Sequence, residues 1–135
     1  MKILITTDWP EQAVNGVATS VKNLKAGLLQ AGNDVRVLTL SGGIHSRKEG
    51  DTYYIGSMSA GVIYPNARLK LMMPSELAQD ILDWKPDVVH SQCIFSTFYL
   101  AREAAYLCKV PLVNTYHTVY EDFTHYFCPS RALGK

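Results

Sequence analysis

The sequence predicts a doubly wound α/β domain, in which helices cover both faces of a mostly parallel sheet. Two observations lead to this prediction. Short apolar runs alternate along the chain with segments whose apolar residues recur at helical spacing. No repeat, linker or low-complexity tract interrupts this alternation. Strands that alternate with helices pair in parallel through crossover connections, and this pairing gives the fold class.

The first third of the chain predicts one strand–helix–strand unit. Residues 2–7 form a short apolar run that ends in polar residues, as a buried parallel strand does. A loop over residues 10–15 precedes a helix that starts at Val17, and Gly32 is the residue expected to terminate that helix. The next apolar run, residues 34–40, is the second strand. The apolar side chains at helical spacing are Val17, Val21, Leu24, Leu28 and Leu29.

The middle of the chain has a weaker pattern. Residues 41–50 form a polar, glycine-containing segment that predicts a loop, and residues 52–55 predict a short strand. Residues 61–73 mix charged and apolar side chains without a clear period.

Arg68 and Lys70 lie in this mixed segment and leave two interpretations open. Their cations could face anionic lipid while the neighbouring apolar side chains enter the headgroup boundary. Alternatively, the apolar side chains pack in the core and the two charges are solvated, which is the favoured interpretation. It would bury Leu69, Leu71, Met72 and Met73.

The last part of the chain returns to a clear alternation. Residues 75–84 have a helical pattern, with Ser75 after a proline as the expected N-cap. Residues 85–92 predict a third buried strand, whose early proline ends the preceding helix. A helix over residues 97–108 and a fourth strand over residues 111–116 complete the predicted domain.

Composition narrows the classes of function. Of the 135 residues, 47% are hydrophobic and 19% are charged, which is usual for a globular domain with its own core. The net charge of +1 gives no overall attraction for a polyanion, so nucleic acid is not an expected partner.

Cysteine usage and the N-terminal run indicate the compartment. Cys93, Cys108 and Cys128 are odd in number and lack CxxC spacing, which is typical of reduced thiols in a cytosolic protein. The opening MKILITTDW is too short and too polar for a signal peptide, and no later apolar segment reaches spanning length. We therefore expect a cytoplasmic protein.

Polar residues follow three of the predicted strands. In an open α/β sheet, ligands bind beyond the carboxyl ends of the strands, so these residues are expected to meet at one edge. Such an edge forms one wall of a cleft, and a second wall is expected from elsewhere. The residues are Thr7, Asp8, Asn15, Gly16, His90, Ser91, Gln92, Tyr116, His117 and Thr118.

The loop AVNGV between the first strand and first helix is a candidate anion site. A glycine at a helix N-terminus lets backbone N–H groups approach a phosphate. The chain has no GxGxxG and no Walker A lysine, so dinucleotide and ATP sites of those kinds are not predicted. The alternative is a plain Asn-Gly turn.

The stretch NTYHTVYEDFTHYF has the highest density of chemically useful side chains. His117, Glu121 and His125 are spaced by four residues, as metal ligands on a helix would be. Because a strand is expected to end near Tyr116, a continuous helix over all three is not, and no metal is predicted. The preferred interpretation is one histidine that donates a hydrogen bond into a cleft, with aromatic and carboxylate side chains at its rim. The alternatives are an amphipathic helix for this stretch and, for His90, Ser91 and Gln92, a hydrated sheet edge.

Three segments resemble a known family. The opening MKILITTDWPEQAVNGVATSVKNLKAGLLQAGNDVRVLT resembles the start of the retaining GT-B glycosyltransferases of family four, and KPDVVHSQ strengthens the resemblance. The segment PLVNTYHTVYEDFTHYF most resembles the members that transfer glucose from UDP-glucose to diacylglycerol. The resemblance implies two Rossmann-like domains that face a cleft. Residues 1–135 would be the N-terminal, acceptor-side domain, incomplete and without the C-terminal domain that carries the donor-binding glutamates.

The resemblance also implies roles for individual residues. Asn15, Gly16 and Val17 would approach the donor diphosphate, and His117 would act at the donor sugar as the catalytic residue. The residues expected on the acceptor side are His90, Ser91, Gln92, Tyr120, Glu121 and His125. No metal or cofactor is implied, because the nucleotide sugar is a substrate. The enzyme would work peripherally at the inner membrane face, with Arg68 and Lys70 near anionic lipid, and these 135 residues alone are expected to be inactive.

Other functions remain open from the residues alone. A transferase of the same fold could use a sugar or polyol acceptor, which would need hydrogen-bonding walls instead of an apolar groove beside His117. A half domain without catalysis could bind a lipid or a partner protein. A small nucleotide-binding protein is disfavoured because the phosphate-binding motifs are absent.

Overall fold

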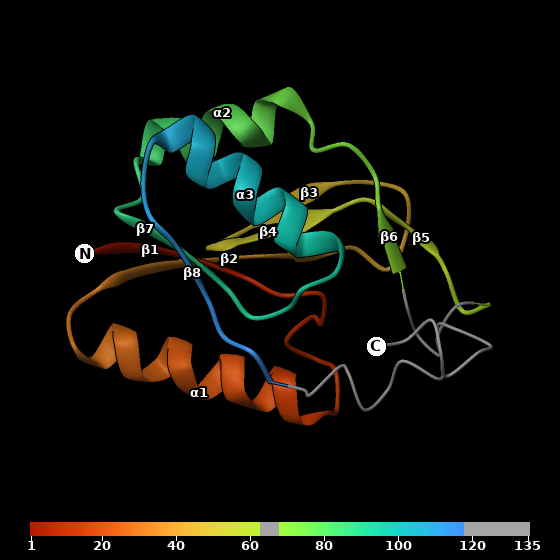
Figure 1. The fold of residues 1–135 in the computed structure, drawn as a ribbon, viewed down its shortest axis with the longest axis horizontal. Coiled ribbons are helices and arrows are strands. Elements are labelled where there is room, and N and C mark those ends of the chain that lie inside the picture. Colours follow the sequence, from red (N-terminus) through yellow and green to blue (C-terminus); the bar gives the residue numbers. More distant parts are fainter. Residues whose placement is uncertain (63–67, 118–135) are drawn as a thin grey trace, which may run out of the picture.

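A computed structural model describes residues 1–62 and 68–117 of the chain. Its main sheet has six strands in the order β3-β4-β2-β1-β7-β8 (Figure 1). All neighbouring strands of this sheet pair in parallel except β3 and β4, which are antiparallel. The strands are β1 Lys2–Thr6, β2 Asp34–Leu40, β3 Arg47–Glu49, β4 Thr52–Ile55, β7 Val88–Ser91 and β8 Leu112–Asn114. A separate two-stranded antiparallel sheet joins β5 Ser57–Ser59 to β6 Arg68–Lys70.

Helices cover both faces of the main sheet. Helix α1, Gly16–Gln30, lies on one face, and α2, Ser75–Trp84, and α3, Ser96–Cys108, lie together on the other (Figure 1). The doubly wound arrangement predicted from the alternation of apolar runs is therefore confirmed. Its strand order changes direction between β1 and β7, which is where ligands bind in folds of this class.

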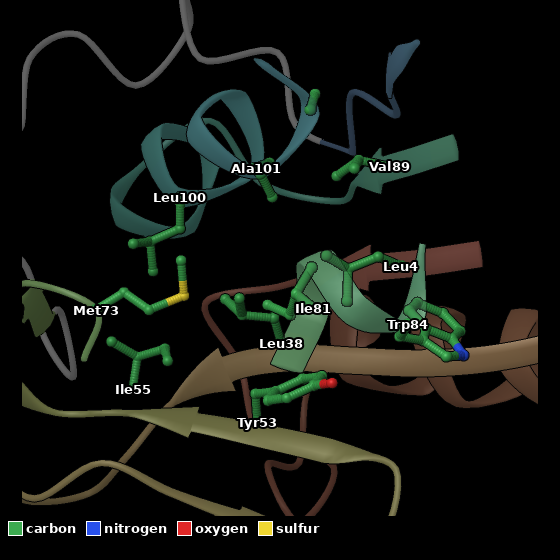
Figure 2. Close-up of a cluster of buried hydrophobic side chains, with 12 residues drawn as sticks. Leu4, Leu38, Tyr53, Ile55, Met73, Ile81, Trp84, Val89, Leu100 and Ala101 are labelled. Atoms are coloured by element: carbon green, nitrogen blue, oxygen red, sulfur yellow. The ribbon is translucent and has the colours of Figure 1, made fainter. Parts of the chain in front are cut away.

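The larger core fills the space between the sheet and the helices α2 and α3. Inward-facing side chains of four strands meet one side of each helix there (Figure 2). Tyr53, Leu4, Leu38 and Ile55 are fully buried, and burial of each such side chain stabilises the fold by roughly 1.5–3 kcal/mol. The buried members are Leu4, Leu38, Tyr53, Ile55, Met73, Ile81, Trp84, Val89, Leu100, Ala101, Ala104 and Ala105.

The smaller core lies between the sheet and α1. Successive strand residues face opposite sides, so Ile3 and Ile5 of β1 point toward α1 while Leu4 points away from it. Four of the five apolar residues predicted at helical spacing pack there: Val17, Val21, Leu24 and Leu28. The fifth, Leu29, is 46% exposed, because it lies beyond the stripe that faces the sheet.

The ends of the first two helices differ in how well the sequence predicted them. Gly32 follows α1 with a φ of +87°, a conformation that glycine adopts without strain, so the predicted terminator is confirmed. The prediction of Ser75 as an N-cap was wrong. The N-cap of α2 is Pro74, which makes no side-chain capping bond, and Ser75 is the first helical residue.

Residues 41–50 also differ from the prediction. Part of this segment, β3, pairs with β4, so the expected loop contains an edge strand. All three residues of β3 are exposed, and such a strand carries no apolar pattern for a sequence to reveal.

The favoured interpretation of residues 61–73 was wrong for two of its four apolar side chains. Leu69 is 52% exposed and Met72 is 87% exposed, whereas Met73 is buried as predicted. Among residues 1–62 and 68–117, the side chain of Leu69 is not among those packed in either hydrophobic core. Arg68 is not simply solvated either, because its Nε donates to Ser57 Oγ at 2.6 Å and its second guanidinium nitrogen donates to Ser57 O at 2.9 Å.

A charged cluster ties α2 to the sheet. Asp80 Oδ2 accepts hydrogen bonds from Tyr53 Oη at 2.5 Å, Lys48 Nζ at 2.9 Å and Arg36 Nη1 at 3.1 Å. The Arg36 guanidinium also lies 4.5 Å from the centre of the Trp84 ring. The Tyr53 hydrogen bond, followed by that of Lys48, holds the pKa of Asp80 below its ordinary value. Burial, followed by the bond to Asp80, raises the pKa of Tyr53 to about 12. We call Arg36, Lys48, Tyr53, Asp80 and Trp84 the Asp80 cluster.

Candidate functional site

The carboxyl ends of β1, β7 and β8 lie side by side. In the sheet register, Thr6 pairs with Ser91, and Ser91 pairs with Asn114. The chain stays ordered beyond these ends, since Gln92 N donates to Thr6 O at 2.8 Å and Thr115 N donates to Ser91 O at 2.9 Å. The topology therefore brings the three strand ends together at one edge, as predicted.

Two side-chain pairs connect the end of β7 and the residue after it to the chain after β8. His90 Nε2 lies 2.7 Å from Thr115 Oγ1, and His117 Nε2 lies 2.8 Å from Gln92 Oε1. The register of β7 and β8 pairs residues 23 positions apart, whereas the partners in both side-chain pairs are 25 apart, so each β7-side residue reaches two residues past its register partner. Burial, followed by the neighbouring His117, lowers the pKa of His90, so its ring favours the neutral form.

His117 is half-buried and lies in the chain after β8, against Gln92 in the chain after β7. Its ring nitrogen Nε2 is engaged with Gln92, so this nitrogen is not the one aimed freely at a ligand. The predicted catalytic role of His117 and the predicted acceptor contact of His90 remain predictions.

Ser91 and Gln92 are buried more deeply than an acceptor-binding role suggests. Ser91 is fully buried, and its hydroxyl donates to Cys93 O at 2.8 Å. The structure therefore gives the Ser91 side chain no surface on which to meet an acceptor. Gln92 is 2% exposed, and its contact with His117 is the feature that joins it to the site.

Several buried polar atoms at this edge have no hydrogen-bond partner within residues 1–62 and 68–117. They are Thr6 Oγ1, Thr39 Oγ1, Gln92 Nε2 and Thr97 Oγ1, near the ends of β1, β2 and β7 and in the first turn of α3. An unpaired buried polar group costs about 1–3 kcal/mol unless water or a ligand satisfies it. Thr6 and Thr39 face opposite sides of the sheet, so unpaired atoms occur near the strand ends on both faces, where water or a ligand can supply the missing partners. Sequence reasoning missed Thr6 and Thr39, although both end otherwise apolar runs.

Asp8 joins the same edge of the sheet to helix α3 by a hydrogen bond. Its Oδ1 accepts a hydrogen bond from Thr97 N at 2.8 Å, so a residue after β1 caps the N-terminus of α3. Burial raises the pKa of Asp8, and the bond from Thr97 opposes that rise. Beside it, burial followed by the charge of Asp8 raises the pKa of the Cys93 thiol to about 11, so this buried cysteine is not a reactive thiolate.

The predicted donor-side residues begin helix α1. Asn15 is the N-cap, and its Oδ1 accepts from Ala18 N at 2.8 Å. A side chain at Gly16 would meet nothing within 4 Å, so the backbone of this first turn is open to a ligand. Val17 is partly buried and packs against the core beneath α1. The donor contacts of Asn15, Gly16 and Val17 remain predictions.

A small hollow of about 20 Å³ lies on the α1 face, beside the strand ends. Trp9, Lys22 and Lys25 line it, together with Thr7 and the unpaired Thr39. Neither His90, Gln92 nor His117 borders it, so this hollow is not the apolar groove that a lipid acceptor would need beside His117.

Three predicted acceptor-side residues, Tyr120, Glu121 and His125, lie outside the described residues, as does Cys128. Within the part of the chain that the structure describes, Cys93 and Cys108 are free thiols. No group of three or more His, Cys, Asp or Glu side chains in that part is arranged to hold a metal ion. None of its helices combines the length and apolar character needed to cross a membrane.

Comparison with known proteins relates this chain to a family. The family model of Glycosyltransferase Family 4 matches residues 14–134. The chain is 32% identical over 127 residues to an alpha-monoglucosyldiacylglycerol synthase of Streptococcus pneumoniae, an alignment that covers 93% of this chain and 29% of that protein.

A second relative is the alpha-monoglucosyldiacylglycerol synthase of Acholeplasma laidlawii. It is 32% identical over 130 residues, covering 93% of this chain and 32% of that protein. The chain therefore spans less than a third of the length of the curated relatives it matches. The family match and the Rossmann-like sheet agree with the fold and family expected from the sequence. The chain belongs to glycosyltransferase family 4.

Proposed function

We propose that this chain is the acceptor-side portion of a retaining transferase that moves glucose from UDP-glucose to diacylglycerol. The observation that carries the proposal is the strand-end site: His117, held by Gln92, lies beside the unpaired buried amide nitrogen of Gln92 in a family 4 domain. Both relatives are synthases of alpha-monoglucosyldiacylglycerol. Glucose is α-linked in UDP-glucose, so an α-linked product corresponds to retention of configuration.

In this proposal, different residues contact the sugar and the diphosphate of the donor. His117 contacts the transferring sugar, while the open first turn of α1 at Asn15 and Gly16 approaches the donor diphosphate. The chain aligns with less than a third of each relative, so we assign most donor binding and most stabilisation of the transition state to a second domain. We accordingly propose that residues 1–135 alone do not transfer glucose.

The test is a transfer assay on a full-length protein that carries this domain. Radiolabelled UDP-glucose is incubated with dioleoylglycerol in mixed micelles, and the lipid product is resolved and its anomeric linkage determined. Formation of α-glucosyldiacylglycerol supports the proposal. Transfer to a free sugar or polyol with no lipid product would replace the acceptor class, and measurable transfer by the 135 residues alone would contradict the division of roles.

We further propose that the β5–β6 sheet lies against the inner membrane face. Met58, Val62, Leu69 and Met72 are exposed apolar side chains on or beside this sheet, and Lys70 is the nearby cation. Arg68 is bound to Ser57, so it contributes less charge to this surface than its sequence suggests.

Co-sedimentation with vesicles that contain phosphatidylglycerol tests this surface. Lys70→Glu and Met72→Ser should each weaken binding, and Arg68→Glu should weaken it too while loosening the contact with β5. Lys22→Glu, an exposed lysine on α1, is the charge-matched control. Unchanged binding by Lys70→Glu and Met72→Ser would contradict the proposed membrane surface and leave the proposed transfer reaction unaffected.

A further inference from the structure

The contact between Gln92 and His117 is rigid on the Gln92 side. Gln92 is 2% exposed, and its backbone N–H extends the ladder to β1 by donating to Thr6 O at 2.8 Å. Beside it, the His90–Thr115 pair joins the same two chain segments in the same register. The Gln92 side chain therefore presents its amide from a fixed position in the sheet.

The chemistry of the contact fixes the proton on the His117 ring. Gln92 Oε1 is a carbonyl oxygen and can only accept a hydrogen bond. His117 Nε2, 2.8 Å away, must therefore be the donor. A neutral imidazole carries one N–H, so when Nε2 holds the proton, Nδ1 has a lone pair.

A second observation shows that the fold does not use the whole Gln92 amide. Its Nε2 atom is buried and has no partner among the residues that the structure describes. A buried glutamine that serves only packing would normally satisfy both ends of its amide. One end holds His117, and the other still has both of its hydrogens to donate.

We infer that Gln92 is the positioning residue for His117. It holds the imidazole as the Nε2–H tautomer and leaves Nδ1 to accept a hydrogen bond from a substrate hydroxyl. The choice of a hydroxyl rests on the proposed function, since both glucose and diacylglycerol carry one. This reverses the role expected from the sequence, in which the histidine donates a hydrogen bond into the cleft.

The tautomer can be read directly by NMR. The chain is labelled with ¹⁵N-histidine, and long-range ¹H–¹⁵N spectra are recorded at alkaline pH, with His117→Gln used to assign the signal. The expected pattern is a protonated Nε2 and an unprotonated Nδ1. An Nδ1–H tautomer, or a signal averaged between the two tautomers, would overturn the inference.

Variants of Gln92 test its part in that result. Gln92→Glu keeps an oxygen acceptor and should keep the Nε2–H tautomer, whereas Gln92→Met removes the acceptor and should give an averaged ring. Thr115→Val is the matched control, because it breaks the neighbouring His90 pair and should leave the His117 tautomer unchanged. A pure Nε2–H tautomer in Gln92→Met would show that Gln92 is not responsible. If Gln92→Met does not fold, the wild-type spectrum still tests the tautomer, and loss of the Nε2–H tautomer in Gln92→Glu, which keeps the acceptor, would contradict the role of Gln92.

Kinetics of a full-length transferase separate this inference from the proposed function. Gln92→Met should lower kcat by about 10- to 100-fold with little change in the KM for UDP-glucose, and Gln92→Glu should restore most of it. Normal kcat in Gln92→Met would overturn the positioning role and leave the transferase proposal intact. Absence of transfer by the wild-type enzyme would defeat the proposed function, while the NMR result would still test the tautomer.

Discussion

Two groups of polar side chains in the described residues differ in how far their hydrogen bonds are satisfied. In the Asp80 cluster, one carboxylate oxygen accepts from three donors, and Arg36 stacks on Trp84. At the strand-end site, Thr6, Thr39 and Gln92 keep buried atoms without a partner in the described residues. The first cluster is completed by the fold and joins α2 to the sheet. The second is left incomplete by the fold, which is the arrangement expected where a ligand supplies the missing partners.

The two aspartates show the same contrast in their protonation. Hydrogen bonds hold the pKa of Asp80 below its ordinary value, so folding favours its charged form. Burial raises the pKa of Asp8, so folding favours its neutral form. Ionised Asp80 therefore stabilises the protein at neutral pH, whereas ionised Asp8 reduces its stability there.

The largest expected effect is on activity at the strand-end site. His117→Ala in a full-length transferase should reduce kcat/KM by about 100-fold or more, because it removes the group proposed to contact the sugar. Its free energy of unfolding should change by less than about 1 kcal/mol, since one half-buried hydrogen bond is lost. Steady-state kinetics and urea unfolding measure the two quantities. Activity within a few-fold of the wild type would contradict the assignment.

In the Asp80 cluster we expect a loss of stability without a loss of activity. Tyr53→Phe removes the buried hydroxyl that donates to Asp80 and accepts from Arg36. The loss of a hydrogen bond to a charged group should destabilise the fold by about 1.5–3 kcal/mol and leave transfer unchanged. Tyr54→Phe on the same strand is the control, and its effect should be within about 0.5 kcal/mol. Equal midpoints for the two variants in urea would refute the structural role of the Tyr53 hydroxyl.

A smaller effect with a definite sign is expected for Asp8→Asn. A carboxyl group whose pKa is raised by folding adds stability below its unfolded pKa of about 4 and loses it as the pH rises through the folded value. Asparagine keeps an oxygen for Thr97 N and does not titrate. Relative to the wild type, the variant should therefore be more stable at pH 7 than at pH 3. Thermal unfolding at the two pH values measures this, and a larger advantage of the variant at pH 3 would contradict the buried carboxyl.

The smallest effect is expected for Asp80→Asn, with the opposite sign. Because folding lowers the pKa of Asp80, its contribution is present above the unfolded pKa and is lost as the pH falls through the folded value. The side chain is 40% exposed, so solvent screening limits the loss at pH 7 to about 1 kcal/mol. The variant and the wild type should converge near pH 2. Convergence at neutral pH and divergence in acid would reverse the comparison between the two aspartates.

The sequence predicted the parts of the fold that depend on local pattern. The period of α1, the stop at Gly32 and the apolar runs of β1, β2 and β7 are written in consecutive residues. Edge strand β3 was missed because its residues are charged and exposed, and its pairing with β4 is tertiary. Leu69 and Met72 were misplaced because both are exposed on or beside the two-stranded sheet, whereas their apolar character alone assigns them to a core.

The site divides in the same way. Strand-end polar residues could be found from sequence because parallel sheets bring such ends together. Ser91 could not be distinguished from Gln92, since the side on which each points depends on the register of β7. The unpaired state of Thr6 and Thr39 and the Gln92–His117 contact depend on neighbours far along the chain. Satisfaction of hydrogen bonds is a property of the packed molecule and leaves no signal in the local sequence.

The measurement that most directly tests the difference between the clusters is a ¹⁵N-HSQC titration of the chain with dihexanoylglycerol, a water-soluble diacylglycerol. We expect saturable shifts at Gln92 and His117, with the amides of Tyr53 and Asp80 unmoved. Saturable shifts centred on the Asp80 cluster, or no saturable shift at the strand ends, would contradict this expectation.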